Sequence, residues 1–206
     1  MFRFALRFCV IALLAGLIFV PASLAGQPVT QGLTPPPPDF ESCKAVGAGV
    51  ICAGARFESY GPVDTEIVCG TGPDAFDIFD QGAFEQHAIR YYNENGNLTR
   101  RVIHEHYSLG QFSNPLAGAT VPYTQTDTIT DVLAVPGDFG SATETETAEN
   151  IYRPAHGAPV FLNAGRTVFA PDGALEFRSG PQGFLDFFID GDASALDQLC
   201  AALSSS

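Results

Sequence analysis

Residues 91–107 read YYNENGNLTRRVIHEHY, with strand-forming residues on both sides of a turn. Gly96 lies where a tight hairpin turn requires a positive φ angle, and the asparagines beside it favour the same kind of turn. Aromatic and β-branched side chains fill the flanking segments, so we expect two paired strands, Phe84–Tyr92 and Leu98–Leu109. This stretch therefore predicts antiparallel β-structure in the middle of the chain.

The same pattern continues outward in both directions, because glycine and proline punctuate short runs of β-branched and aromatic residues. Asp172-Gly173 predicts a second tight hairpin, and helical periodicity is confined to Ala193–Leu203 after a capping Asp192. The further expected strands are Arg56–Tyr60, Thr65–Cys69, Thr120–Val135, Ser141–Tyr152, Val160–Asn163, Arg166–Ala170 and Ala174–Ser179. The predicted fold is all-β, an antiparallel meander that forms a small barrel or sandwich with a short C-terminal helix and two disulfides.

The amino-terminal residues have the features of a secretory signal peptide. Residues 1–25 carry two arginines, then an apolar run too short to span a bilayer, then small residues before a cleavage point after Ala25. Residues 26–39 contain four consecutive prolines and predict a flexible, extended arm. We therefore expect a secreted, extracellular protein with one β-rich domain over residues 40–206.

The chain is acidic, with 10 lysines and arginines against 23 aspartates and glutamates. Removal of the leader takes Arg3 and Arg7 with it, so 8 basic residues remain and the formal charge becomes −15. A protein with this charge repels phosphate backbones and anionic lipid surfaces. We expect no nucleic-acid partner and no membrane insertion, while the oligomeric state stays open.

Four cysteines follow the leader: Cys43, Cys52, Cys69 and Cys200. An even number in an exported chain predicts two disulfides, and sequence alone allows three pairings. The short spacing between Cys43 and Cys52 favours a small closed loop, which leaves Cys69 to hold the C-terminal segment through Cys200. No C-x-x-C spacing is present, so a zinc site built from cysteines is disfavoured.

Three histidines lie in or beside the central hairpin. His104 and His106 alternate, so they share one face of a strand. A hairpin loop with an even number of residues places His87 on that same face, and an odd loop sends it to the opposite face. Three imidazoles with an open position are the ligand set of a catalytic zinc site. The apolar Ile89 and Val102 share this face, which suggests a surface that faces the core and becomes polar at one end.

Threonines alternate along two of the expected strands. Thr124, Thr126, Thr128 and Thr130 lie on one face of the first, and Thr143, Thr145 and Thr147 lie on one face of the second. Threonine suits a half-exposed pleated surface, so we interpret both rows as solvated faces. The alternative is a polar, water-filled lumen.

Other candidate chemistry is weak. Asp74, Asp77 and Asp80 are spaced by three, which matches no established calcium loop, and the aromatic residues between them suggest a turn with its carboxylates outside. No nucleophile elbow and no phosphate-binding loop occurs in the sequence. We therefore assign no catalytic residue and expect no cofactor.

Several positions from Cys69 onward form a set of cysteine and turn residues: Cys69, Asn114 to Gly118, Ala164-Gly165-Arg166, Asp172-Gly173, Gly180 to Gly183 and Leu199-Cys200. On these residues the chain resembles a group of uncharacterised secreted bacterial β-domain proteins. It departs from them at Ala117, where threonine is usual, and in its Cys43/Cys52 extension. The resemblance spans Cys69 to Leu203. It implies a compact β-domain and a Cys69–Cys200 bridge, and it implies no activity.

Two functions remain as hypotheses. The first is a non-catalytic extracellular binding or cell-surface accessory protein, because the aromatic residues exceed what a few strands need and could line a pocket for an apolar or sugar-like ligand. The second is a metal-dependent or cyclase-like β-barrel enzyme that uses His87, His104 and His106.

Overall fold

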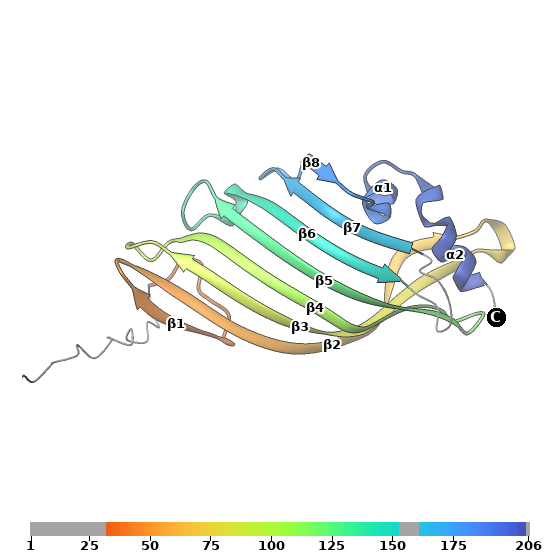
Figure 1. The fold of residues 1–206 in the computed structure, drawn as a ribbon, viewed down its shortest axis with the longest axis horizontal. Helices are drawn as coiled ribbons and strands as arrows, with labels where there is room; N and C mark the ends of the chain where they lie inside the picture. Colours follow the sequence, from red (N-terminus) through yellow and green to blue (C-terminus); the bar gives the residue numbers. More distant parts are fainter. Residues whose placement is uncertain (1–31, 153–160, 205–206) are drawn as a thin grey trace, which may run out of the picture.

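The computed structural model describes residues 32–152 and 161–204 (Figure 1). Eight strands form one antiparallel sheet in sequence order. They are β1 Glu41–Val46, β2 Gly49–Cys69, β3 Phe76–Tyr92, β4 Leu98–Asn114, β5 Ala119–Leu133, β6 Ala142–Tyr152, β7 Phe161–Phe169 and β8 Leu175–Ser179. Two α-helices, α1 Gly183–Phe188 and α2 Asp197–Ser204, follow the sheet, and three short 3-10 helices are η1 Gly72–Asp74, η2 Phe139–Ser141 and η3 Ala193–Leu196.

The predicted antiparallel meander is confirmed. The prediction that it forms a barrel or sandwich is wrong, because the strands form one open sheet. Within the described residues, β1 pairs only with β2 and β8 pairs only with β7. A barrel needs its first and last strands to pair along much of their length. The edge strands here have only 6 and 5 residues, against 21 for β2. The C-terminal helices pack against one end of the sheet instead (Figure 1).

The sheet is nevertheless strongly curved, and its two faces differ. The hydroxyls of Tyr60 in β2 and Tyr123 in β5 are 2.7 Å apart, although two strands separate β2 from β5. We call the face that carries these tyrosines the inner face; it also holds the buried side chains of Gln86, Ala88 and Arg90. The opposite surface is the outer face.

The apolar core lies mainly at the helical end of the inner face. Its largest cluster joins strand residues to the C-terminal segment, and its members are Ile67, Cys69, Phe76, Ile78, Phe112, Val121, Tyr123, Leu196, Leu199 and Leu203. Asn114 in β4 donates a hydrogen bond of 3.1 Å from Nδ2 to the carbonyl oxygen of Leu203, which fixes the end of α2 against the sheet. A smaller cluster of Cys43, Cys52, Tyr92, Leu98 and Leu133 lies at the other end.

Both predicted disulfides are present. Cys43–Cys52 joins opposed residues of the β1–β2 hairpin, and Cys69–Cys200 ties the end of β2 to α2 across 131 residues of sequence. The first bridge lies in the smaller core cluster and the second in the larger one. Each disulfide therefore reinforces an end of the sheet.

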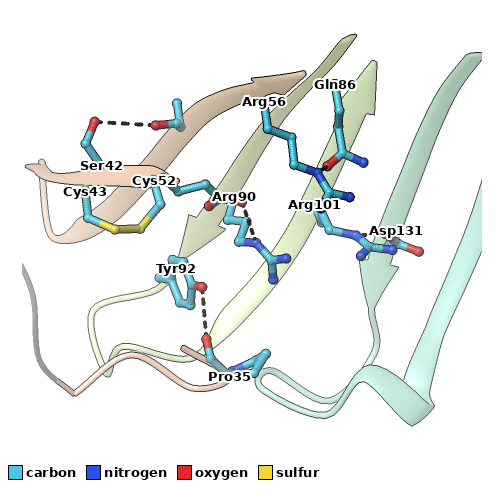
Figure 2. A network of polar contacts seen from close by, with 12 residues as sticks. Pro35, Ser42, Cys43, Cys52, Arg56, Gln86, Arg90, Tyr92, Arg101 and Asp131 are labelled. Atoms are coloured by element: carbon cyan, nitrogen blue, oxygen red, sulfur yellow. Dashed lines mark hydrogen bonds and ion pairs between the residues drawn. A yellow bond between two sulfur atoms is a disulfide. The ribbon is translucent and has the colours of Figure 1, made fainter. Parts of the chain in front are cut away.

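The second half of the proline-rich arm is held by the central hairpin. Thr34 donates its backbone N–H to the carbonyl oxygen of Gly96 and accepts the N–H of Leu98, both at 2.8 Å. The Tyr92 hydroxyl donates to the carbonyl oxygen of Pro35 at 2.9 Å (Figure 2). A Cβ at Gly96 would lie 2.3 Å from the carbonyl oxygen of Gly32, so glycine permits this close crossing. The predicted signal peptide and residues 26–31 lie outside the described residues.

Several strand boundaries differ from prediction. The expected strands Arg56–Tyr60 and Thr65–Cys69 are one strand, β2, interrupted by two register shifts. The expected strands Val160–Asn163 and Arg166–Ala170 likewise correspond to one strand, β7, which runs from Phe161 to Phe169, and Val160 lies outside the described residues. Neither β1 nor α1 was predicted. The expected C-terminal helix divides into η3 and α2 after Asp192, whose side chain accepts from Ser194 N–H. No helix among the described residues is long and apolar enough to cross a membrane.

Candidate functional site

The three hairpin histidines do share one face, through a combination of loop and bulge. Tyr92 pairs with Leu98, which encloses an odd loop of five residues, but Tyr91 pairs with Arg100. The bulge at Thr99 adds one residue, so beyond it the strands pair as they would around a loop with an even number of residues. His87 therefore lies directly opposite His104, and Glu85 lies opposite His106.

This histidine row lies on the outer face, so the prediction that it faces the core is wrong. The inner face is the opposite one, because Gln86 and Ala88 are buried while Glu85 and His87, which alternate with them in β3, are exposed. Each imidazole is bound to a neighbour: Nε2 of His87 is 3.0 Å from Glu85 Oε1, and Nδ1 of His104 is 2.9 Å from Thr128 Oγ1.

Nδ1 of His106 similarly lies 3.2 Å from the hydroxyl of Thr126. Among the described residues, no group of three histidine, cysteine, aspartate or glutamate side chains is arranged to hold a metal ion. As placed, the three rings form an exposed polar row on β3 and β4, beside the threonines of β5. The metal-site hypothesis remains a prediction to be tested.

The threonine rows lie on this same outer face. Thr128 pairs with Thr147 and Thr130 pairs with Thr145 across β5 and β6, so the two rows form one hydroxyl-bearing surface beside the histidines. Because the sheet is open and the rows lie outside its curve, they do not line a lumen. Their interpretation as a solvated face agrees with this placement.

The inner face carries ion pairs at the end away from the helices. Arg90 Nε is 2.9 Å from Glu41 Oε1, and Arg101 Nε is 2.6 Å from Asp131 Oδ2. Figure 2 shows Arg56 and Arg101 extending from neighbouring parts of this face towards Gln86 and Asp131. At this end of the sheet, Arg56, Arg90 and Arg101 therefore all make buried or half-buried structural contacts.

The middle of the inner face holds three carboxylates that we call the carboxylate cluster: Glu105, Asp127 and Glu146. Glu105 and Asp127 are directly opposed across β4 and β5. Glu146 is diagonal to Asp127, because the residue opposite Asp127 is Ala148, two positions along β6. Like charges at such positions repel one another.

Burial dominates the protonation behaviour of the cluster. It raises the pKa of Asp127 to about 6, with a further contribution from the charge of Glu105, while a hydrogen bond from Gln125 lowers it. It raises the pKa of Glu146 to about 7, with the charges of Asp127, Glu144 and Glu105 acting in the same direction. Neutral donors serve Glu105: Gln86 Nε2 and, at 3.0 Å, the Tyr107 hydroxyl.

Nearer the helices, two tyrosines surround Asp80. The Tyr60 hydroxyl donates to Asp80 Oδ2 at 3.0 Å, and Tyr123 lies 3.0 Å from Asp80 Oδ1. Burial raises the pKa of Asp80 despite these bonds, and it raises that of Tyr60 to about 12. The predicted turn with outward carboxylates holds for Asp74 and Asp77 but is wrong for Asp80, because β3 begins at Phe76 and its two-residue period places Asp80 inside.

A cavity of about 260 Å³ lies between these groups and the first helix. Its lining comprises Asp80, Phe112, Tyr123, Gln125, Glu146, Ala148, Asn163, Gly165, Thr167, Gln182, Phe184 and Leu185. A second, more open hollow of about 300 Å³ shares Asp80, Tyr123 and Gln125 with it and adds Tyr60, Phe84 and Tyr107. The two hollows therefore lie on either side of a common wall.

Two glycines make this geometry possible. A Cβ at Gly110 would lie 2.2 Å from the Tyr123 ring, and one at Gly165 would lie 2.5 Å from Gln182 Nε2. Both distances are below van der Waals contact. Glycine at these positions lets the Tyr123 ring and the Gln182 amide approach the sheet backbone and form walls of the cavity.

No family model, curated protein or solved structure matches the chain. Sequence reasoning missed the inner-face carboxylates, although one signal was available. Gln125, Asp127 and Asp131 alternate with the threonines of β5, and polar residues on both faces of one strand indicate that the face opposite the threonines also has a polar site.

Proposed function

We propose that the protein is a secreted, non-catalytic binding protein that holds a small hydroxyl-rich, sugar-like ligand in the inner-face cavity. The observation that carries this proposal is the lining itself, in which aromatic rings alternate with amides and carboxylates around about 260 Å³. Binding pockets combine apolar walls with a few convergent polar groups. This cavity is close to the lower end of the usual size range of about 300–1,000 Å³, which suits a single small ring.

The polar residues suit hydroxyl groups in particular. Each sugar hydroxyl both donates and accepts, and the amides of Gln125, Asn163 and Gln182 offer both functions within one side chain. The carboxylates of Asp80 and Glu146 add acceptors, while Phe112 and Phe184 supply flat apolar surface for the C–H groups of a sugar ring. The proposed function thus follows from matching donor and acceptor types.

Calorimetric titration of the mature chain with a panel of neutral monosaccharides and disaccharides tests this proposal. We expect at least one sugar to bind, and Gln125→Ala, which removes an amide from the cavity wall, to weaken it about tenfold, as loss of one net hydrogen bond allows. Gln111→Ala is the matched control, because Gln111 lies between the inner-facing Gly110 and Phe112 and so points outward. Equal affinities for the two variants would place binding elsewhere, and no binding by any sugar would contradict the proposal.

A further inference from the structure

The carboxylate cluster lacks a cationic partner in the described part of the chain. Arg90 and Arg101 are paired with Glu41 and Asp131. Arg56 contacts Gln86 and Glu58, at 2.7 and 2.9 Å. These contacts leave Glu105, Asp127 and Glu146 without an ion pair among the described residues.

The fourth arginine near this face is also engaged. Arg178 pairs with Thr167 across β7 and β8, and Thr167 in turn pairs with Glu146. The Arg178 guanidinium, however, lies 2.9 Å from Asp186 and 2.6 Å from Asp190. It therefore points to the helical segment rather than to the cluster.

Asp127 provides an independent observation. Its residue is only 3% exposed, and its Oδ1 is buried with no hydrogen-bond partner, while Oδ2 accepts from Gln125. A buried carboxylate oxygen without a donor is costly. The other such oxygen, Glu41 Oε2, belongs to a carboxylate already paired with Arg90. Asp127 therefore has an unused acceptor as well as an unneutralised charge.

The position of Asp127 connects this acceptor to the cavity. Its β5 neighbour Gln125 and its diagonal neighbour Glu146 both line the cavity, and the charges of Asp127 and Glu146 influence one another. Asp127 adjoins these two lining residues without being a lining residue itself, so a donor that enters the cavity beside Glu146 comes next to it. The described carboxylates are not arranged so that three of them could hold one metal ion, which favours an organic cation.

We propose that the ligand of this cavity carries an ammonium group, as an amino sugar does, and that this group binds between Asp127 and Glu146. The inference rests on the proposed function and specifies its ligand class. An ammonium group offers three donors and a positive charge. It supplies the donor that Asp127 Oδ1 lacks and the charge that offsets the repulsion within the cluster, while the hydroxyls of the same ligand use the amides of the wall.

A matched pair of probes tests the inference on the whole mature chain. The probes are 2-aminoethyl glucoside, whose alkylamine is protonated at pH 7.5 as a lysine is, and 2-hydroxyethyl glucoside, which is neutral and of similar size. We expect the amine to bind at least tenfold more tightly by calorimetry. Equal affinity for the two probes would overturn the ammonium inference but leave the binding function standing, whereas no binding by either would overturn both.

Three variants identify the groups responsible. Asp127→Asn and Glu146→Gln should each reduce the preference for the amine over the neutral probe at least fivefold. Glu149→Gln is the control, since it removes the same charge from the outer face opposite Thr126 and should keep the preference. If Asp127→Asn does not fold, judged by circular dichroism, Glu146→Gln alone decides the outcome. A preference that survives Glu146→Gln, or that falls equally in Glu149→Gln, would contradict the inference.

Discussion

At the residue scale, Asp127 is the most informative side chain of the inner face. It is an acid buried in the middle of a strand and opposite another acid, and its one hydrogen-bond donor within the described residues is the neutral amide of Gln125. Removing a charge from water without a counter-charge is unfavourable. The residue therefore costs stability in the unliganded protein, which is typical of a position kept for binding.

Asp127 also predicts how stability depends on pH. Its pKa rises from an ordinary 3.8 to about 6, so between these values the folded state binds more protons than the unfolded chain. The free energy of unfolding must then fall as pH increases from about 4 to about 7. Glu146 extends the same trend, because its pKa is raised to about 7.

We expect Asp127→Asn to flatten this dependence. Near pH 3 the variant and the natural protein should be about equally stable, because the carboxyl is then mostly protonated in both the folded and the unfolded state. At pH 8 the variant should be more stable by on the order of 1 kcal/mol, since the amide has no charge to bury. Urea unfolding at both pH values measures the difference, with Glu149→Gln as the control that keeps the natural slope. A variant less stable at pH 8 than the natural protein would show that the carboxylate has a partner.

The histidines allow a separate test of the metalloenzyme hypothesis. Because His87, His104 and His106 are exposed and each is hydrogen-bonded to a neighbouring side chain, we predict no stoichiometric zinc in protein purified without a histidine tag. Added zinc should leave Tm unchanged in the natural protein and in His104→Ala and His106→Ala alike. A rise in Tm that both variants abolish would instead support the metal site.

At the element scale, β2 and α2 illustrate how the chain holds an open sheet together. The end of β2 and the apolar stripe of α2 meet in the larger core cluster, and the Cys69–Cys200 bridge lies within it. The β1–β2 hairpin at the other end depends on a much shorter loop, of separation 9. The two bridges therefore constrain the unfolded chain to different extents.

Removing each bridge in turn should reveal this difference. On the loop-entropy relation, Cys69→Ser with Cys200→Ser should lower the free energy of unfolding by about 5 kcal/mol, and Cys43→Ser with Cys52→Ser by about 2–3 kcal/mol. Urea denaturation of the two double variants gives both values. Comparable losses, or a larger loss for the hairpin bridge, would mean that α2 contributes less to the closed end than its packing indicates.

The same elements show what could be read from the sequence. Gly96 and Asp172-Gly173 predicted their hairpins correctly, with φ angles of 77° at Gly96 and 81° at Gly173, because turn chemistry is local. The bulge at Thr99 could not be predicted, since it depends on cross-strand pairing. It decides which residue opposes His87. The carboxylate cluster was missed because its members come from three different strands, and only the pairing of those strands brings them together.

At the scale of the whole molecule, the decisive property is that a single sheet curves without closing. Alternating residues and regular turns are shared by barrels, sandwiches and curved open sheets, so the sequence could not separate them. The separation comes from long-range features: the short edge strands, the Tyr60–Tyr123 contact over Asp80, and the helices packed at one end. Together they create the cavity on the inner face, and the outer face keeps the histidines and threonines.

The central claim is that a sugar-like ligand binds on the inner face of this sheet. The most direct test is a ¹H–¹⁵N NMR titration of the mature chain with 2-aminoethyl glucoside, following the side-chain amides. We predict that the signals of Gln125, Asn163 and Gln182, which line the cavity, shift with one common dissociation constant, while that of Gln111 stays fixed. Shifts confined to the outer face, or no shift in the cavity amides at saturating probe, would contradict the account.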